Sequence, residues 1–127
     1  MTYKLSKREI KFRAWDKKRK KMIFLKKLLP ALEDRYILMQ YTGLKDKKGK
    51  EIYEGDIVRW ANGIGVIVWN RHYGMWDCLY ISGEELPDGN LGVWTNGVGG
   101  DSLRLLEIIG NIFQNPELLT QTYEQKR

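Results

Sequence analysis

Short apolar segments that alternate with turn residues constrain the fold of this chain most strongly, because several short strands at regular spacing are typical of all-β domains. Three such segments follow one another at 57–60, 64–69 and 75–81. Asn62-Gly63 separates the first two, and this dipeptide is a strong signal for a β-hairpin turn. The pattern predicts a β-meander that opens a small barrel, with an SH3-like closure around residues 52–81.

The N-terminal part of the chain carries a second hairpin signal. From Glu9 to Asp16 apolar and charged residues alternate, which is the period of a half-buried strand. A run of basic residues follows, and Met22 to Leu25 then has strand composition. We therefore expect a hairpin over residues 9–25 with a basic tip.

The remaining segments complete a mainly β prediction with one helix. We expect strands at 36–41, 50–53, 91–95 and 103–109, the third of them inside a long loop over residues 82–101. Asn115, Pro116 and Glu117 supply a cap, a proline and an acidic residue where a helix begins, so a short helix should follow at about 116–124. We expect a single domain over residues 1–127, with a basic hairpin subdomain (1–50) and a β-meander subdomain (51–127).

Charge is distributed unevenly along the chain. Residues 1–30 hold 12 Lys and Arg against 2 Asp and Glu, whereas residues 51–127 hold 5 against 11. This asymmetry can steer an anionic partner, nucleic acid above all. It can equally dock the basic segment on the acidic part of its own or a neighbouring chain, so charge alone leaves both alternatives open.

The basic hairpin is the candidate nucleic-acid-binding site. Basic side chains beside an exposed aromatic ring can hold phosphates while the ring stacks on a base. The residues that we expect to contact nucleic acid are Lys11, Arg13, Trp15, Lys17, Lys18, Arg19, Lys20 and Lys21. The alternative is a solvated hairpin in which Trp15 covers core or a subunit contact.

Catalysis has little support in the sequence. His72 is the only histidine and Cys78 the only cysteine, so a multi-histidine metal site, a disulfide and a CxxC pair cannot form within one chain. We expect His72 at the surface and Cys78 buried in a strand, because a free cysteine is commonly buried. The glycine-rich stretch 96–101 lacks the Lys-Ser/Thr of a phosphate-binding loop. We therefore expect no enzyme activity, no cofactor and no metal.

Aromatic residues mark the ends of the predicted meander strands. Trp60, Trp69 and Trp76 should cluster at one side of the meander. Core packing is the commoner role of such a cluster, and binding of a peptide or a single strand is the alternative.

The sequence also predicts the compartment. No apolar run approaches the roughly 20 residues that cross a bilayer, and the first eleven residues lack the apolar stretch of a secretion signal. A single cysteine fits a reducing environment. We expect a cytoplasmic protein with no membrane contact.

Three blocks of sequence resemble a known family. They are REIKFRAWD at 8–16, MQYTGLKDKKGKEIYEGDIV at 39–58 and IGNIFQNPELL at 109–119. These blocks are similar, in the same order, to the YopX family of bacteriophage and prophage proteins. The resemblance implies a mostly β fold, a phage or prophage origin and the cytoplasm of an infected or lysogenic bacterium, and it implies no activity.

Together these observations predict a phage accessory protein that is a non-enzymatic binding module, with DNA or RNA as its partner. The alternative is a protein–protein interaction or assembly protein that does not bind nucleic acid. Its partners would be phage or host proteins, or further copies of the same chain in a homo-oligomer.

Overall fold

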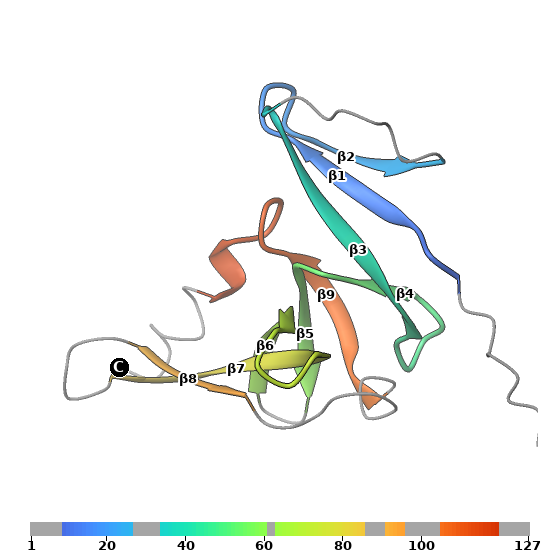
Figure 1. Cartoon of the computed structure of the whole chain (residues 1–127). Coiled ribbons are helices and arrows are strands. Elements are labelled where there is room, and N and C mark those ends of the chain that lie inside the picture. The colour runs from blue at the N-terminus through green and yellow to red at the C-terminus, as the bar shows by residue number, and fades with distance from the viewer. Residues whose placement is uncertain (1–8, 27–33, 61–62, 86–90, 96–104, 120–127) are drawn as a thin grey trace, which may run out of the picture.

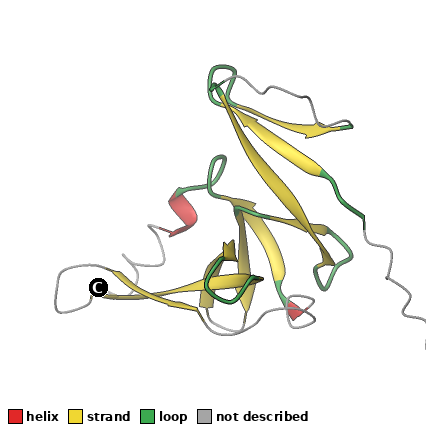
Figure 2. Cartoon of the chain, viewed as in Figure 1, coloured by secondary structure: helices red, strands yellow, loops and turns green. Residues whose placement is uncertain are grey.

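The computed structural model describes residues 9–26, 34–60, 63–85, 91–95 and 105–119 (Figure 1). Within these ranges strands make up almost all of the regular structure, and they form two antiparallel sheets (Figure 2). The predicted mainly β class is therefore confirmed. Among the described residues, no helix is long and apolar enough to cross a membrane.

The first sheet contains the N-terminal hairpin. Its strands, in the spatial order β2-β1-β3-β4, are β1 (Phe12–Asp16), β2 (Lys21–Leu25), β3 (Tyr36–Lys45) and β4 (Glu51–Tyr53). β1 and β2 pair from Phe12 opposite Leu25 to Asp16 opposite Lys21. This pairing confirms the predicted hairpin with its basic tip.

The second sheet contains the meander and curls like half a barrel (Figure 1). Its strands, in the spatial order β8-β7-β6-β5-β9, are β5 (Asp56–Trp60), β6 (Gly63–Asn70), β7 (Met75–Glu85), β8 (Leu91–Thr95) and β9 (Glu107–Asn111). The predicted run of adjacent strands is confirmed. Because β8 and β9 are the two edges of this sheet, its described part is open.

Several element ends differ from the prediction. Gly43 adopts φ +87 as a bulge inside β3, so the strand continues to Lys45, whereas we expected it to end at residue 41. β7 extends to Glu85 because it pairs with β8, which shortens the expected loop. The last described helical residues are 117–119. The remainder of the expected helix, at 120–124, lies outside the described residues.

The buried core joins both sheets. Ile52 of β4 packs with Val58, Ile67 and Cys78 of the second sheet and with Leu106, which precedes β9. Each of these side chains is almost completely buried. Because β4 belongs to the first sheet and contributes to this core, it fixes the β3–β4 hairpin against the meander. The proposed division into subdomains at residue 50 stays a prediction.

Candidate functional site

The tip of the first hairpin is a turn held by one carboxylate. Asp16 Oδ1 accepts the backbone N–H of Lys18 at 3.0 Å and of Arg19 at 3.1 Å, and its carbonyl accepts the N–H of Lys20. Lys20 completes the turn with φ +57, a left-handed conformation. Burial opposes ionisation of Asp16, but the N–H groups of Arg19 and Lys18, together with the charges of Arg35 and Arg19, lower the pKa of this carboxyl. The tip therefore has a defined backbone.

The basic side chains of this tip all face solvent. We call the tip the segment formed by Lys17, Lys18, Arg19, Lys20 and Lys21, each of which is exposed. None of them forms an ion pair with another described residue. The structure thus brings five of the predicted binding residues together in one exposed cluster.

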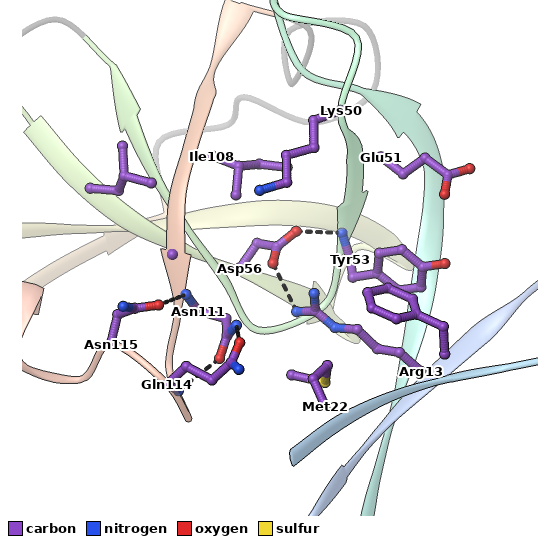
Figure 3. Close-up of a pocket in the computed structure, with 13 residues that line it drawn as sticks. Arg13, Met22, Lys50, Glu51, Tyr53, Asp56, Ile108, Asn111, Gln114 and Asn115 are labelled. Atoms are coloured by element: carbon purple, nitrogen blue, oxygen red, sulfur yellow. Dashed lines mark hydrogen bonds and ion pairs between the residues drawn. The ribbon is translucent and has the colours of Figure 1, made fainter. Parts of the chain in front are cut away.

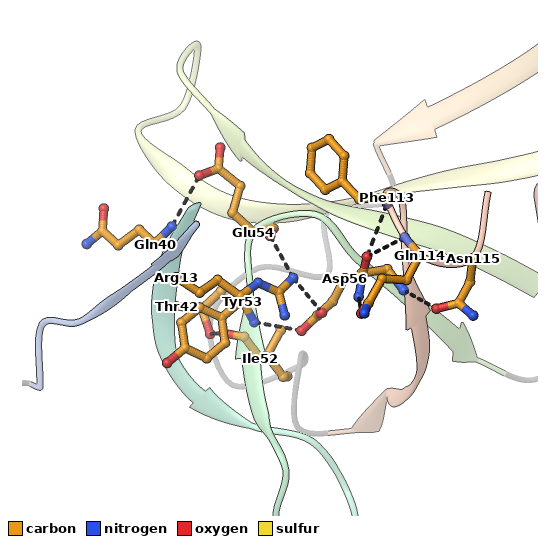
Figure 4. A network of polar contacts seen from close by, with 11 residues as sticks. Arg13, Gln40, Thr42, Ile52, Tyr53, Glu54, Asp56, Phe113, Gln114 and Asn115 are labelled. Carbon is orange, nitrogen blue, oxygen red and sulfur yellow. Dashed lines mark hydrogen bonds and ion pairs between the residues drawn. The ribbon is translucent and has the colours of Figure 1, made fainter. Parts of the chain in front are cut away.

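Arg13 does not lie on that surface. Only 5 % of it is exposed. Its guanidinium donates to Asp56 Oδ1 at 2.8 Å and to the carbonyl of Glu54 at 3.1 Å (Figure 4). It also lies over the ring of Tyr53, 4.8 Å from the centroid. The prediction that Arg13 lies on an exposed face is wrong, because this face of β1 covers the second sheet.

Trp15 is also buried, with 7 % of its surface exposed. Its ring stacks on Phe113 at a centroid distance of 5.5 Å and an angle of 14°. Trp15 therefore packs inside the protein, as the alternative interpretation had it, and is not positioned to stack on a base.

Lys11 lies half-buried at the far end of the same face. It pairs with Glu9 at 3.1 Å and with Glu51, and it lies 4.9 Å from the ring centroid of Tyr41. The hydrogen bond to Glu51 raises the pKa of Lys11. Its charge is thus compensated within the chain.

A cleft of about 650 Å³ opens between the two sheets (Figure 3). One side comes from the first sheet and the adjoining Lys50, and the other from β5, β9 and the turn that follows β9. The residues that line it are Arg13, Met22, Phe24, Lys50, Glu51, Tyr53, Asp56, Ile108, Ile109, Gly110, Asn111, Gln114 and Asn115. Sequence patterns did not predict this cleft, because it forms only where the sheets meet.

Amide side chains organise the wall that follows β9. Asn111 Oδ1 accepts the backbone N–H of Phe113 and Gln114. Asn111 Nδ2 donates to Gln114 Oε1 at 2.7 Å (Figure 3). Asn115 Oδ1 accepts the N–H of Asn111 at 3.2 Å. A Cβ at Gly110 would lie 2.6 Å from Asn115 Oδ1, so only glycine permits this close approach.

The edge of β9 is covered in a similar way at its other end. Asp46, in the β3–β4 turn, accepts the N–H of Ile108 through Oδ2 at 3.0 Å. Its Oδ1 accepts the N–H groups of Lys48 and Lys50. Burial opposes ionisation of Asp46, but these three N–H groups prevail and lower its pKa. The Asp46 carboxylate therefore connects the β3–β4 turn of the first sheet to β9 of the second.

His72 and Cys78 occupy the predicted environments. His72 is exposed in the turn after β6, whereas Cys78 is buried in β7 opposite Ile67. Burial, together with the neighbouring Asp77 charge, raises the pKa of the Cys78 thiol to about 12. A protonated, buried thiol is a poor nucleophile. In the part of the chain that the structure describes, no group of three His, Cys, Asp or Glu residues could hold a metal ion.

Two of the three tryptophans that we expected to cluster are in contact, beside the turn of the β6–β7 hairpin. Trp69 and Trp76 are cross-strand partners whose rings lie edge to face, 5.1 Å apart. Trp69 remains 48 % exposed. The side chain of Trp60 lies outside the described residues.

Comparisons with known proteins agree with the fold. The sequence model of the family described as YopX protein matches residues 25–120. The crystal structure of protein EF1440 from Enterococcus faecalis is similar, with a TM-score of 0.54 and 28% sequence identity over 89% of this chain and 99% of that chain. A comparison with curated proteins found no match. Because the family match spans most of the chain, including the central and closing blocks, this protein belongs to the YopX family.

Proposed function

We propose that the chain is a non-enzymatic module that binds nucleic acid through the tip of its first hairpin. The observation that carries this proposal is a contrast in charge compensation. Lys47, Lys48 and Arg59 share Glu107, and Lys11 and Arg13 have their own carboxylate partners. The five basic residues of the tip have no such partner among the described residues, and all are exposed.

Phosphate contacts explain what such a tip contributes. Each phosphate that a Lys or Arg neutralises releases counterions, so affinity falls steeply with salt, by a log–log slope of about −0.7 per contact for single strands and −0.9 for duplex. Phosphate contacts carry no sequence information by themselves. We expect binding that tolerates many sequences. Because Asp16 already fixes the backbone of the turn, little backbone conformational entropy is lost on binding.

A pair of matched double variants tests the tip. Lys18→Gln/Arg19→Gln removes two charges from it, and Lys45→Gln/Arg71→Gln removes two exposed charges elsewhere. Fluorescence anisotropy of labelled single- and double-stranded oligonucleotides, over a series of salt concentrations, measures affinity and slope. We expect the tip variant to lose about tenfold or more in affinity and to flatten the slope by about two contacts. Equal losses in both variants would show that only net charge matters and would overturn the assignment to the tip.

A protein partner is the second candidate, and exposed apolar side chains favour it. Phe24 is 62 % exposed and Leu38 37 % exposed, on opposite faces of the first sheet. Each face of the first sheet thus offers one apolar contact to a protein partner, whereas a contiguous patch would be the stronger signal. In this case light scattering gives a mass several times the 15.0 kDa of one chain, and the tip variant dissociates the assembly while oligonucleotides do not bind. A phage origin and a cytoplasmic setting belong to either proposal.

A further inference from the structure

The inter-sheet cleft has an unequal supply of hydrogen-bonding groups. Most of its side-chain acceptors are already occupied. Asp56 Oδ1 accepts from Arg13 and Oδ2 from the backbone N–H of Tyr53. Glu51 pairs with Lys11, outside the cleft lining. The amide oxygens of Asn111, Gln114 and Asn115 also accept hydrogen bonds, each from within the turn that follows β9 or from β9 itself.

Donors, in contrast, remain available around the cleft. Arg13 Nε is buried and has no hydrogen-bond partner within the described residues. The amide nitrogens of Gln114 and Asn115 and the ammonium of Lys50 likewise have none there, because the hydrogen bonds of these residues use their backbone N–H groups or their side-chain oxygens. A buried donor without a partner is costly, and a ligand oxygen that supplies one stabilises the complex. The cleft therefore favours a ligand that is rich in acceptors and negatively charged.

An apolar and aromatic surface lies on the side of the cleft that the first sheet forms, where Phe24 is the cross-strand partner of Arg13. Phe24 meets Tyr53 edge to face, with centroids 5.7 Å apart and an angle of 78°. Phe24 is 62 % exposed, so most of its ring is free for contact, and Met22 lies on the same strand beside the cleft (Figure 3). Aromatic and thioether side chains of this kind pack well against a planar ring. A ligand that matches both the free donors and this aromatic surface combines an anionic group with a flat ring.

We propose that the cleft binds one nucleotide unit, with its phosphate among the free donors and its base against Phe24. This assignment rests on the proposed function, in which nucleic acid is the partner. The cleft volume lies within the range of small-molecule sites, about 300–1,000 Å³. β2 leads directly from the tip at Lys21 to Met22 and Phe24 of the cleft, so a strand held by the tip passes near the cleft. The same chemistry is offered by a free nucleoside monophosphate and by the phosphorylated end of a strand.

Substitution of Gln114 by glutamate is the most selective test. The Gln114→Glu side chain still accepts from Asn111 Nδ2 but has lost its free N–H₂ group and carries a negative charge. Gln114 is exposed, so the fold should tolerate the change. A second variant, Phe24→Ser, removes the exposed ring that we propose as the contact for the base. The variant Lys45→Gln/Arg71→Gln is the control, because it lowers the net charge by two at exposed residues outside the cleft lining.

Calorimetric titration with adenosine monophosphate, adenosine and inorganic phosphate distinguishes the contribution of the donors from that of the Phe24 ring. We expect adenosine monophosphate to bind the unmodified protein and, with unchanged affinity, Lys45→Gln/Arg71→Gln. It should bind Gln114→Glu and Phe24→Ser at least about tenfold more weakly, which corresponds to about 1.4 kcal/mol. Adenosine or phosphate alone should bind more weakly than the nucleotide. No binding of the nucleotide, equal binding by Gln114→Glu, or equally tight binding of phosphate alone overturns the proposal.

A competition experiment identifies the source of the nucleotide. An oligonucleotide with a 5′-phosphate that displaces adenosine monophosphate better than its unphosphorylated form assigns the cleft to the end of a strand. Failure of both oligonucleotides to displace adenosine monophosphate assigns the cleft to a free nucleotide. The cleft and the tip can fail separately, because Gln114→Glu tests only the cleft and the tip variant tests only the proposed function.

Discussion

Arg13 and Asp56 form an ion pair that joins the two sheets, with 2.8 Å between the guanidinium nitrogen and Oδ1. Both side chains are almost completely buried. Burial raises the pKa of the Asp56 carboxyl, although the Arg13 charge and the N–H of Tyr53 oppose this rise. Each partner thus depends on the other to avoid an uncompensated buried charge.

Removing one member of this pair should be more harmful than replacing both. Asp56→Ala leaves the guanidinium without its counter-ion, and we expect a loss of about 3–5 kcal/mol in the free energy of unfolding. The double variant Arg13→Met/Asp56→Leu should lose less than the sum of its two single variants. Urea unfolding of the unmodified protein, of Arg13→Met, of Asp56→Leu and of the double variant measures the coupling energy between the two side chains. Strictly additive losses would show that the two side chains act independently.

The stack of Trp15 on Phe113 leads to a prediction about binding. Trp15→Phe keeps a ring in the buried position, so the protein should fold and should bind oligonucleotides with unchanged affinity and salt slope. Trp15→Ala should lower the free energy of unfolding by about 3–5 kcal/mol, because it leaves a large cavity. Anisotropy and urea titrations check both variants. A Trp15→Phe protein that is fully stable but binds oligonucleotides poorly would show that Trp15 takes part in nucleic-acid binding.

Local patterns were sufficient to predict the strands and the tip. Alternation identified β1, and the exposure of Lys17 to Lys21 follows from a short run of charge at a turn. The length of β3 was missed because Gly43 has the same composition signal in a bulge as in a turn. The burial of Arg13 could not be predicted, because its partner is 43 residues away in another sheet. The cleft was missed for the same reason.

Glu107 predicts how stability responds to acid. Hydrogen bonds from Lys48 and then Arg59 lower the pKa of Glu107 from 4.5 to about 2. A carboxyl with a depressed folded-state pKa stabilises fully above its ordinary pKa, and this contribution is lost as the pH falls through the folded-state value.

We therefore expect the stability difference between the unmodified protein and Glu107→Gln to be constant above about pH 5 and to vanish towards pH 2. Denaturant unfolding across this range measures the difference. High salt should diminish it, because Lys48 and Arg59 are largely exposed. A difference that stays the same down to pH 2 would contradict the assigned role of the ion pairs.

The Cys78 thiol should be unreactive towards thiol reagents in the folded protein. Its pKa of about 12 and its burial leave almost no thiolate near pH 8. A thiol reagent should label it only at the rate at which the protein opens, and rapidly in denaturant. Gly65→Ala offers a comparison, since a Cβ there would lie 2.4 Å from Cys78 Sγ; the resulting crowding should destabilise the fold and speed labelling. Fast labelling of the unmodified native protein would disprove this account.

The two side chains that cover the edge of β9 have a consequence for the behaviour of the protein at high concentration. Asp46 and Asn115 occupy the N–H groups of Ile108 and Asn111, which an incoming strand would otherwise use. An unprotected edge is a template for cross-β growth between molecules. A protein whose described part is mainly β-sheet thereby protects one edge of its larger sheet from filament formation with its own side chains.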